Sequence, residues 1–319
     1  MGKPTKHILR QGPVIRTLGS AALQAMKQRV RGVSDTMPAL PGETFTAQLP
    51  ARPKDLVRDY LRNVGGEPSS YRQHLPPHLF PQLAFPVVSK TLRDVPYPLL
   101  KVLNGGCRVE IKSQIPAGES LDVRARLESI DDNGRRAVLH QSIVTGTKSA
   151  PDAMTAHLYA IVPTGGKEEK KAANGQSNGQ GKNGHANGNG KPKAKREPAR
   201  VPHIVDELER WNLREDAGLE FAMLTGDFNP VHWVSPYARA FGFRNTILHG
   251  FATMARAWEG LNRRLYSGDV SAIESFDVQF TRPLVLPHRV GLYVDGNDLY
   301  VGDAPGGPAY LVGKFTTRE

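Results

Sequence analysis

The sequence is poor in cysteine, in aromatic residues and in long apolar runs. Its 319 residues include one cysteine, Cys107, so neither a disulfide framework nor a metal site built from several thiolates is available. Aromatic residues make up 7% of the chain and hydrophobic residues 39%, a low share for a chain that folds throughout. No apolar run has the length of a membrane span, and no secretory signal is visible. These absences favour a protein of a reducing compartment that is not transmembrane.

The excess of positive charge is confined to two segments. The net charge of the chain is +11. Residues 1–31 hold seven Lys or Arg and no acid, and residues 166–200 hold nine Lys or Arg and three Glu, so the segments carry +7 and +6. The rest of the chain therefore carries −2. Since a nucleic-acid groove places positive charge on the folded surface among aromatic residues, the sequence predicts no nucleic-acid partner.

Composition also predicts four regions. The segment 166–200 consists mainly of Gly, Asn and Lys, which predicts a flexible linker. We therefore expect a basic N-terminal segment at 1–40, an N-terminal half at 41–165, the linker, and a C-terminal half at 201–319. The basic segment has the features of a transit peptide, of a membrane-surface helix or of a contact for an acidic carrier protein. We favour a simpler interpretation, a basic helix folded onto the body.

The two halves share a pattern. VEIKSQIPAGESLDV, which starts at Val109, and FDVQFTRPLVLPHRV, which starts at Phe276, both read as an alternating strand, a proline, a turn and a second strand. Pro116 and Pro283 differ by the same 167 positions as the two starting residues. Upstream, LFPQLAFPVVSKTL resembles FRNTILHGFATMARAW. The sequence therefore predicts an internal duplication, with one helix followed by an antiparallel meander in each half, which is an α+β pattern.

Periodicity predicts the individual elements. The stretch REDAGLEFAMLTG predicts a helix that ends at Gly226, and Ser235-Pro236 predicts a short helix with Ser235 as its N-cap. Apolar residues at a spacing of three to four predict a longer helix of about five turns over 251–265. Strands are expected near residues 107–115, 120–129, 136–146, 153–163, 272–281, 288–296 and 309–317.

The segment GDFNPVH carries the candidate chemistry. Pro230 cannot continue a helix, and it pushes Asn229 into an extended conformation. Asp227 therefore leaves the end of one helix, and His232 follows a turn. We expect the side chains of Asp227 and His232 to converge on one wall of a cleft.

A second candidate feature, His249-Gly250, stands at the start of the longer helix. The first turn of a helix has free backbone N–H groups and the positive end of the dipole, and glycine lets a ligand approach the backbone. This pair therefore predicts an oxyanion hole that faces Asp227 and His232. Simpler interpretations exist: a loop aspartate that binds backbone N–H groups, a half-buried histidine, and a glycine that permits tight helix packing.

The stretch from Phe221 to Ala238 resembles the signature of the MaoC-like, (R)-specific enoyl-thioester hydratases and dehydratases. That signature is an aromatic residue, a short spacer, aliphatic-small-Gly-Asp-x-Asn-Pro-aliphatic-His and, five residues later, Ala or Ser. Here it reads Phe221, LTGDFNPVH at 224–232, and Ala238. The family's His-Gly is present as His249-Gly250. The resemblance implies an α+β double hot-dog fold, in which two antiparallel sheets each wrap around a long central helix.

The resemblance also implies an activity and the roles of residues. The activity is the reversible hydration of 2-enoyl thioesters of CoA or of an acyl carrier protein to (R)-3-hydroxyacyl thioesters, in fatty-acid metabolism. Asp227 and His232 would be the catalytic pair, and the backbone N–H of Gly250 would hold the thioester oxygen. Asn229 and His249 would support the site.

Further residues refine this expectation. Phe251 and Met254, on the first turn of the helix, are candidates for the wall of an acyl-chain tunnel, although core packing is the more common role of such residues. Some single-domain members of the family have a serine eight residues after the glycine, where this chain has Trp258. The first half has Glu67 and His74 at another spacing, so we expect one active site per chain.

Two other functions stay open at this point. A thioesterase on the same fold also needs a carboxylate base, but not this motif, and a non-catalytic acyl-binding protein would not need Asp227 and His232. The expected chemistry requires no metal and no other cofactor. We expect a cytoplasmic location, with a mitochondrial one as the alternative, and the chain is compatible with a homodimer.

Overall fold

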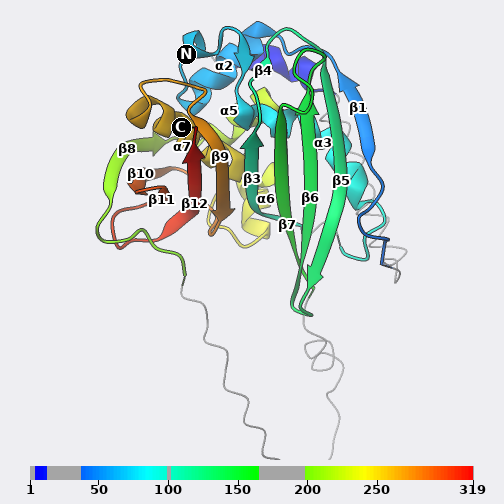
Figure 1. The fold of residues 1–319 in the computed structure, drawn as a ribbon. Coiled ribbons are helices and arrows are strands. Elements are labelled where there is room, and N and C mark those ends of the chain that lie inside the picture. Colours follow the sequence, from blue (N-terminus) through cyan, green and yellow to red (C-terminus); the bar gives the residue numbers. More distant parts are fainter. Residues whose placement is uncertain (1–3, 13–36, 99–101, 165–197, 319) are drawn as a thin grey trace, which may run out of the picture.

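The computed structural model describes residues 4–12, 37–98, 102–164 and 198–318 (Figure 1). The elements of the first half are, in chain order, η1 (Thr5–Gln11), β1 (Phe45–Leu49), α2 (Lys54–Val64), η2 (Pro68–Tyr71), β2 (His74–Leu75), η3 (Pro77–Leu79), α3 (Phe80–Val88), η4 (Ser89–Leu92), β3 (Leu103–Ile111), β4 (Ile115–Pro116), β5 (Leu121–Asp132), β6 (Arg136–Gly146) and β7 (Met154–Pro163). Those of the second half are β8 (Asp206–Leu213), α5 (Ala217–Thr225), η6 (Pro230–His232), α6 (Ser235–Ala240), α7 (Gly250–Leu265), β9 (Ile273–Phe280), β10 (His288–Asp295), β11 (Asp298–Gly302) and β12 (Ala309–Thr317).

One antiparallel sheet of ten strands runs through both halves. Its order is β1-β5-β6-β7-β3-β9-β12-β11-β10-β8, so the two halves contribute five strands each and meet at β3 and β9 (Figure 1). In this central pair Val109 lies opposite Phe276. These are the two residues that the offset of 167 aligns, so a pseudo-twofold axis passes between them. The predicted duplication and α+β class are therefore present in the structure.

Sequence patterns predict seven strands of this sheet and miss β1, β8 and β11. The strands β1 and β8 are the two edges of the sheet, and each has one neighbour. β8 is half-buried over much of its length without a clear alternation, because an edge strand has no need for one continuous buried face. β11 has only five residues, too few for a reliable period of two.

The helices of the second half follow the predictions closely, with two corrections. α5 ends at Gly226, which has a φ of +82°, as predicted. α7 has 16 residues, slightly more than four turns rather than five. The prediction of Ser235 as an N-cap was wrong. Val234 has the extended backbone of the cap, and the Ser235 side chain makes no capping hydrogen bond.

The described residues of the first half, 41–98 and 102–164, do not contain the second long helix that the family resemblance implies. Its counterpart of α7 is α3, which has nine residues and continues as the 3-10 helix η4. Pro86 lies inside α3. Proline has no N–H, and its ring crowds the preceding turn. α7 is therefore the long central helix of the described residues.

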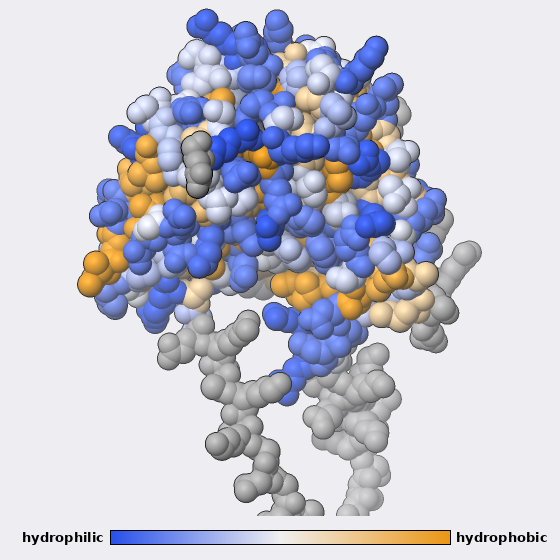
Figure 2. Space-filling view, in the orientation of Figure 1, coloured by the Kyte–Doolittle hydropathy of each residue, from blue (hydrophilic) through white to orange (hydrophobic). Residues whose placement is uncertain are grey.

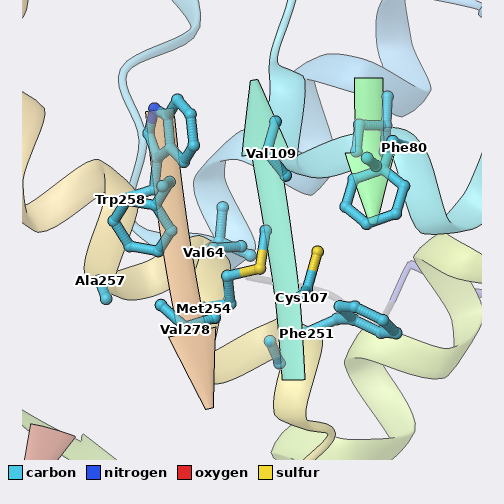
Figure 3. Close-up of a cluster of buried hydrophobic side chains, with 14 of the residues drawn as sticks. Val64, Phe80, Cys107, Val109, Phe251, Met254, Ala257, Trp258 and Val278 are labelled. Carbon is cyan, nitrogen blue, oxygen red and sulfur yellow. The ribbon is translucent and has the colours of Figure 1, made fainter. Parts of the chain in front are cut away.

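The core lies between α7 and the centre of the sheet. Figure 3 shows Trp258, Met254 and Phe251 among side chains of β3 and β9. Met254 and Trp258 are fully buried, and burying a side chain such as Met254 contributes about 2 kcal/mol. In Figure 2 hydrophilic side chains cover much of the opposite, outer face of the sheet. The sheet thus presents one face to α7 and the other to solvent.

The start of the described chain packs onto the body. The Nε2 atom of His7 lies 2.9 Å from Asp59 Oδ2, and an Nη1 of Arg10 donates to Asp55 Oδ1 at 2.6 Å. Both acids belong to α2. The favoured interpretation of the basic segment therefore holds for η1, although as a 3-10 helix. The remainder of that segment up to residue 36 lies outside the described residues.

Most of the predicted linker, residues 165–197, also lies outside the described residues. Directly after it, Ala199 O accepts a hydrogen bond from Ala309 N at 3.1 Å, and Arg200 forms a bridge with Pro308. The predicted region boundaries stay a prediction. Within the described part of the chain, no helix is both long and apolar enough to cross a membrane.

Candidate active site

The turn after α5 is held by its own side chains. Asn229 Oδ1 accepts a hydrogen bond from Val231 N at 3.3 Å, so Asn229 caps the 3-10 helix η6. Asp227 Oδ1 accepts from Asn229 N at 3.4 Å. Pro230 is the first residue of η6, where its missing N–H is not needed. The sequence Asp-x-Asn-Pro therefore closes the turn that carries His232 back toward Asp227.

A backbone carbonyl fixes the tautomer of His232. The Nδ1–H of His232 donates to Ile247 O at 2.8 Å. Ile247 N in turn donates to Val231 O at 3.2 Å, so the segment before α7 is tied to η6 in both directions. With Nδ1 protonated, the neutral ring has its lone pair on Nε2. His232 can therefore accept a proton at Nε2.

His249 joins this pair from the start of α7. Its Nε2–H donates to the backbone oxygen of Asp227 at 3.0 Å, and its ring stacks on that of His232 with centroids 3.6 Å apart. One ligand-type atom from each of Asp227, His232 and His249 lies within 4.8 Å of the others. Three of the residues singled out from the sequence thus form one cluster.

Burial keeps both histidines neutral. Loss of solvation lowers the pKa of His232 below its usual range, although the Asp227 carboxylate and the Ile247 carbonyl oppose the shift. Burial, assisted by the neighbouring His232, lowers the pKa of His249 to about 3. His249 is therefore neutral at physiological pH and serves to hold the Asp227 backbone, while neutral His232 keeps a basic nitrogen.

The same three residues have the donor types of a metal site, but their geometry does not favour one. His249 Nε2 is already used on the Asp227 carbonyl oxygen. The planes of the two imidazole rings are only 23° apart. Since the lone pair of a ring nitrogen lies in the ring plane, the two rings do not point at a shared tetrahedral centre. The donor set therefore suits proton transfer better than metal binding.

Gly250 begins α7 beside this cluster. The carbonyl of His249 accepts from Ala252 N at 3.0 Å and from Thr253 N at 3.2 Å, whereas the N–H of the first helical residue has no acceptor within its own helix. A Cβ at position 250 would lie 3.0 Å from ring atoms of Phe280. The packing interpretation of Gly250 is therefore supported, and a role of its N–H as an oxyanion donor stays a prediction.

Gly218 is a residue of this site that the motif does not contain. It lies in α5, and a Cβ there would be 2.1 Å from the backbone oxygen of His232. The glycine therefore allows α5 to pack directly against the turn that holds His232. The sequence contains a signal for this role. A glycine within a helix costs about 1 kcal/mol relative to alanine, so its presence there usually has a packing reason.

The two acyl-chain candidates lie in the core. Phe251 is 6% exposed, and its ring centroid lies 5.8 Å from those of Phe80 and Phe280. Met254 is fully buried. Phe251 is next to Gly250 and at the end of the core, so a role in acyl-chain binding stays a prediction for it, as it does for Met254.

The remaining candidates are structural. Trp258, at the position of the family's serine, is buried in the core and contacts Phe276 with ring centroids 4.9 Å apart. In the first half Glu67 Oε1 accepts from Ser69 N at 3.1 Å as a cap of η2, and His74 belongs to β2. These observations agree with the prediction that the motif of the second half has no counterpart in the first.

Comparison with known proteins places this site in a family. Residues 193–303 match the family described as MaoC like domain. The matched residues belong to a MaoC-like domain. The protein named probable enoyl-CoA hydratase 2 of Dictyostelium discoideum is 22% identical over 209 residues, which are 64% of this chain and 64% of the relative. The chain thus spans slightly less than two thirds of that relative's length.

Solved structures support the fold of the whole chain. HtdX of Mycobacterium tuberculosis has a TM-score of 0.62 and 19% sequence identity, with 86% of this chain and 100% of that chain covered. A second Mycobacterium tuberculosis protein, described as having a double hot-dog fold, has a TM-score of 0.54 and 14% identity, with 88% and 96% covered. The predicted double hot-dog fold is therefore confirmed.

Proposed function

We propose that this protein catalyses the reversible hydration of 2-enoyl thioesters to (R)-3-hydroxyacyl thioesters. The observation that carries the proposal is the convergence of Asp227 and His232, within 4.8 Å of each other, beside the N-terminus of α7. The MaoC-like domain and the relative named enoyl-CoA hydratase 2 support the same activity. The substrate class is an acyl thioester of CoA or of a carrier protein.

In the proposed reaction Asp227 and His232 bracket one water molecule. His232 Nε2 takes a proton from the water as its oxygen bonds to C3 of the enoyl group. The C2–C3 double bond becomes a single bond, and negative charge develops on the thioester oxygen. A proton from the same pair then reaches C2. No step breaks the bond between the carbonyl carbon and sulfur, so the thioester stays intact. Each positioned acid or base contributes about 10²–10⁴-fold in rate.

The N–H of Gly250 is the proposed donor to the thioester oxygen. It stands at the positive end of a helix of 16 residues, whose dipole favours negative charge at this point. One preorganised donor of this type typically stabilises a transition state by about 3–4 kcal/mol. Asn229 and His249 support the pair, because they hold the turn and the Asp227 backbone.

The ultraviolet absorbance of the enoyl thioester tests the proposal. If the protein is a hydratase, the absorbance of the crotonyl-CoA double bond decreases and no free thiol appears. Release of thiol would instead identify a thioesterase, and an unchanged spectrum together with binding would identify an acyl-binding protein. Either of these results contradicts the proposed reaction. A catalytically inert protein heated beyond unfolding serves as the blank.

We also propose a cytoplasmic location, with a mitochondrial one as the alternative, and a homodimer as a candidate assembly. A single thiol that is fully buried, Cys107, is compatible with a reducing compartment. Fractionation of cells and sedimentation of the purified chain test these two points separately.

A further inference from the structure

A pocket with two arginines lies next to the site. We call it the arginine pocket. It has a volume of about 330 Å³ and is lined by Arg244, Arg282, Pro283, Val285, His288, Pro308 and Tyr310. Within the described part of the chain, neither guanidinium group forms an ion pair with a carboxylate. Two arginines without acidic partners in one pocket indicate a site for an anion.

The other polar groups of the pocket are held in place. Tyr310 OH donates to Asp303 Oδ1 at 2.9 Å and lies 3.0 Å from His288 Nε2. His288 Nε2 lies 2.7 Å from the same oxygen of Asp303. The carboxylate of Asp303 is therefore engaged by Tyr310 and His288.

The arginine pocket shares a wall with the candidate active site. Ile247 and Val285 form a bridge, Leu248 N donates to Leu284 O at 2.8 Å, and Val285 lines the pocket. Ile247 O is also the acceptor of His232 Nδ1–H. One short segment thus has the catalytic histidine on one side and the arginine pocket on the other. The candidate active site and the arginine pocket are therefore adjacent.

We propose that the arginine pocket binds a phosphate ester on the carrier arm of the thioester substrate. The inference rests on the proposed function, since an enoyl thioester of pantetheine carries phosphate on its distal end in both CoA and a carrier protein. The planar guanidinium group matches phosphate oxygens with two parallel hydrogen bonds, which makes Arg a strong phosphate ligand. The pocket would therefore select phosphorylated carriers and contribute to KM rather than to the chemical step.

The test compares three thioesters that share the crotonyl-pantetheine part and differ in the group at its distal end. They are crotonyl-CoA, crotonyl-4′-phosphopantetheine and crotonyl-pantetheine. In the double variant Arg244→Gln/Arg282→Gln, we expect KM for crotonyl-CoA to rise at least about tenfold, with kcat within about twofold, because charged hydrogen bonds are lost. The kcat/KM for crotonyl-pantetheine should not change. Arg289→Gln is the matched control, since Arg289 is exposed, follows His288 and does not line the pocket.

Crotonyl-4′-phosphopantetheine separates the two sources of phosphate, the pantetheine phosphate and the nucleotide phosphates of CoA. A rise in KM for both phosphorylated substrates assigns the pocket to the phosphate that CoA and carrier proteins share. A rise for crotonyl-CoA alone assigns it to the nucleotide phosphates. An unchanged KM for crotonyl-CoA, or an equal loss with crotonyl-pantetheine, overturns the proposal. Calorimetric titration of free CoA into wild type and the double variant measures binding without turnover. Weaker binding to the double variant supports the phosphate site even if the proposed reaction is wrong, and equal binding overturns the site even if the reaction is right.

Discussion

The two halves of this molecule share a fold and differ in their chemistry. Their strands occupy matching places on either side of the β3–β9 pair, with Val109 facing Phe276 at the centre. The second half has Asp-x-Asn-Pro-x-His and a glycine at the start of its long helix. At the corresponding start the first half has Phe80, whose backbone N–H already donates to Pro77 O. The two halves therefore share the arrangement of their strands but not the candidate catalytic residues.

The first half still contributes to the position of the second. Tyr71 OH and His78 Nε2 both lie 2.7 Å from Oε1 of Glu259, which is a buried residue of α7. Tyr60 OH extends this network through His78 Nδ1 at 2.9 Å. Two side chains of the first half thus contact the Glu259 carboxylate of α7, and Tyr60 supports one of them. The half without the motif serves as the support on which α7 rests.

The largest expected effect comes from removing the proton-transfer pair. Asp227→Asn and His232→Ala should each lower the hydration rate about 10²–10⁴-fold, because each removes a group that handles a proton. The first half provides the controls, Glu67→Gln and His74→Ala, which should retain the wild-type rate. Initial rates with crotonyl-CoA, with circular dichroism to confirm folding, check this. A folded Asp227 variant with more than about a tenth of the rate would break the contrast between the halves.

A large loss of stability is expected when the contact between the halves is cut. Glu259→Ala leaves His78 and Tyr71 buried without their acceptor, and breaking a buried pair in this way typically costs about 3–5 kcal/mol. The free energy of unfolding in urea measures it. The exposed Glu274 provides the control variant Glu274→Ala, which should change little. A loss below about 1 kcal/mol, or two separate unfolding transitions, would show that the halves are independent.

An intermediate effect is expected at Gly218. The variant Gly218→Ala adds a Cβ where the His232 backbone oxygen would be 2.1 Å away, so the turn must shift. Displacing a catalytic group by about 1 Å can cost 10²-fold, and we expect kcat to fall between about tenfold and 10²-fold. Gly12→Ala is the control, because a Cβ there meets nothing within 4 Å. Wild-type kcat in a folded Gly218 variant would rule out its role in positioning His232.

A smaller effect concerns pH. The pKa of His249 is about 3 in the folded protein, against about 6.5 when unfolded. Between these two pH values the unfolded chain binds a proton at His249 that the folded chain does not bind. The free energy of unfolding is therefore not reduced by this group above about pH 6.5, and it falls as the pH decreases below that value. This one group contributes a slope of about 1.4 kcal/mol per pH unit. Urea unfolding from pH 4.5 to 6 should therefore give a shallower slope for His249→Gln than for wild type. Equal slopes would mean that His249 is not buried as a neutral ring.

The sequence allowed the fold and the central site residues to be predicted, for physical reasons that can be named. Asp227, Pro230 and His232 are linked by local constraints, since a proline and a capping asparagine define one turn whatever surrounds it. The stacking of His249 on His232 and the role of the Ile247 carbonyl depend on tertiary contacts between η6 and the segment before α7. Local spacing does not encode such contacts.

The misses among the elements have the same origin. The edge strand β8 lacks a regular alternation because only one side of it is paired. Pro86 favours a short helix at α3, whereas the family resemblance implies a long helix in each half. Gly218 could have been noticed as a glycine inside a helix, but its neighbour, the His232 backbone, is 14 positions away. Close packing between separate elements is visible only in the folded chain.

The stereochemistry of hydration tests the account most directly. If one wall carries Asp227 and His232 while Gly250 holds the carbonyl, water and proton must both reach the same face of the enoyl group. Hydration of crotonyl-CoA in deuterated water, followed by chiral chromatography and NMR of the product, measures this. The account predicts the (R)-3-hydroxyacyl thioester with hydroxyl and deuterium added syn. An (S) product or anti addition would contradict the placement of the carbonyl at Gly250 and the single catalytic wall.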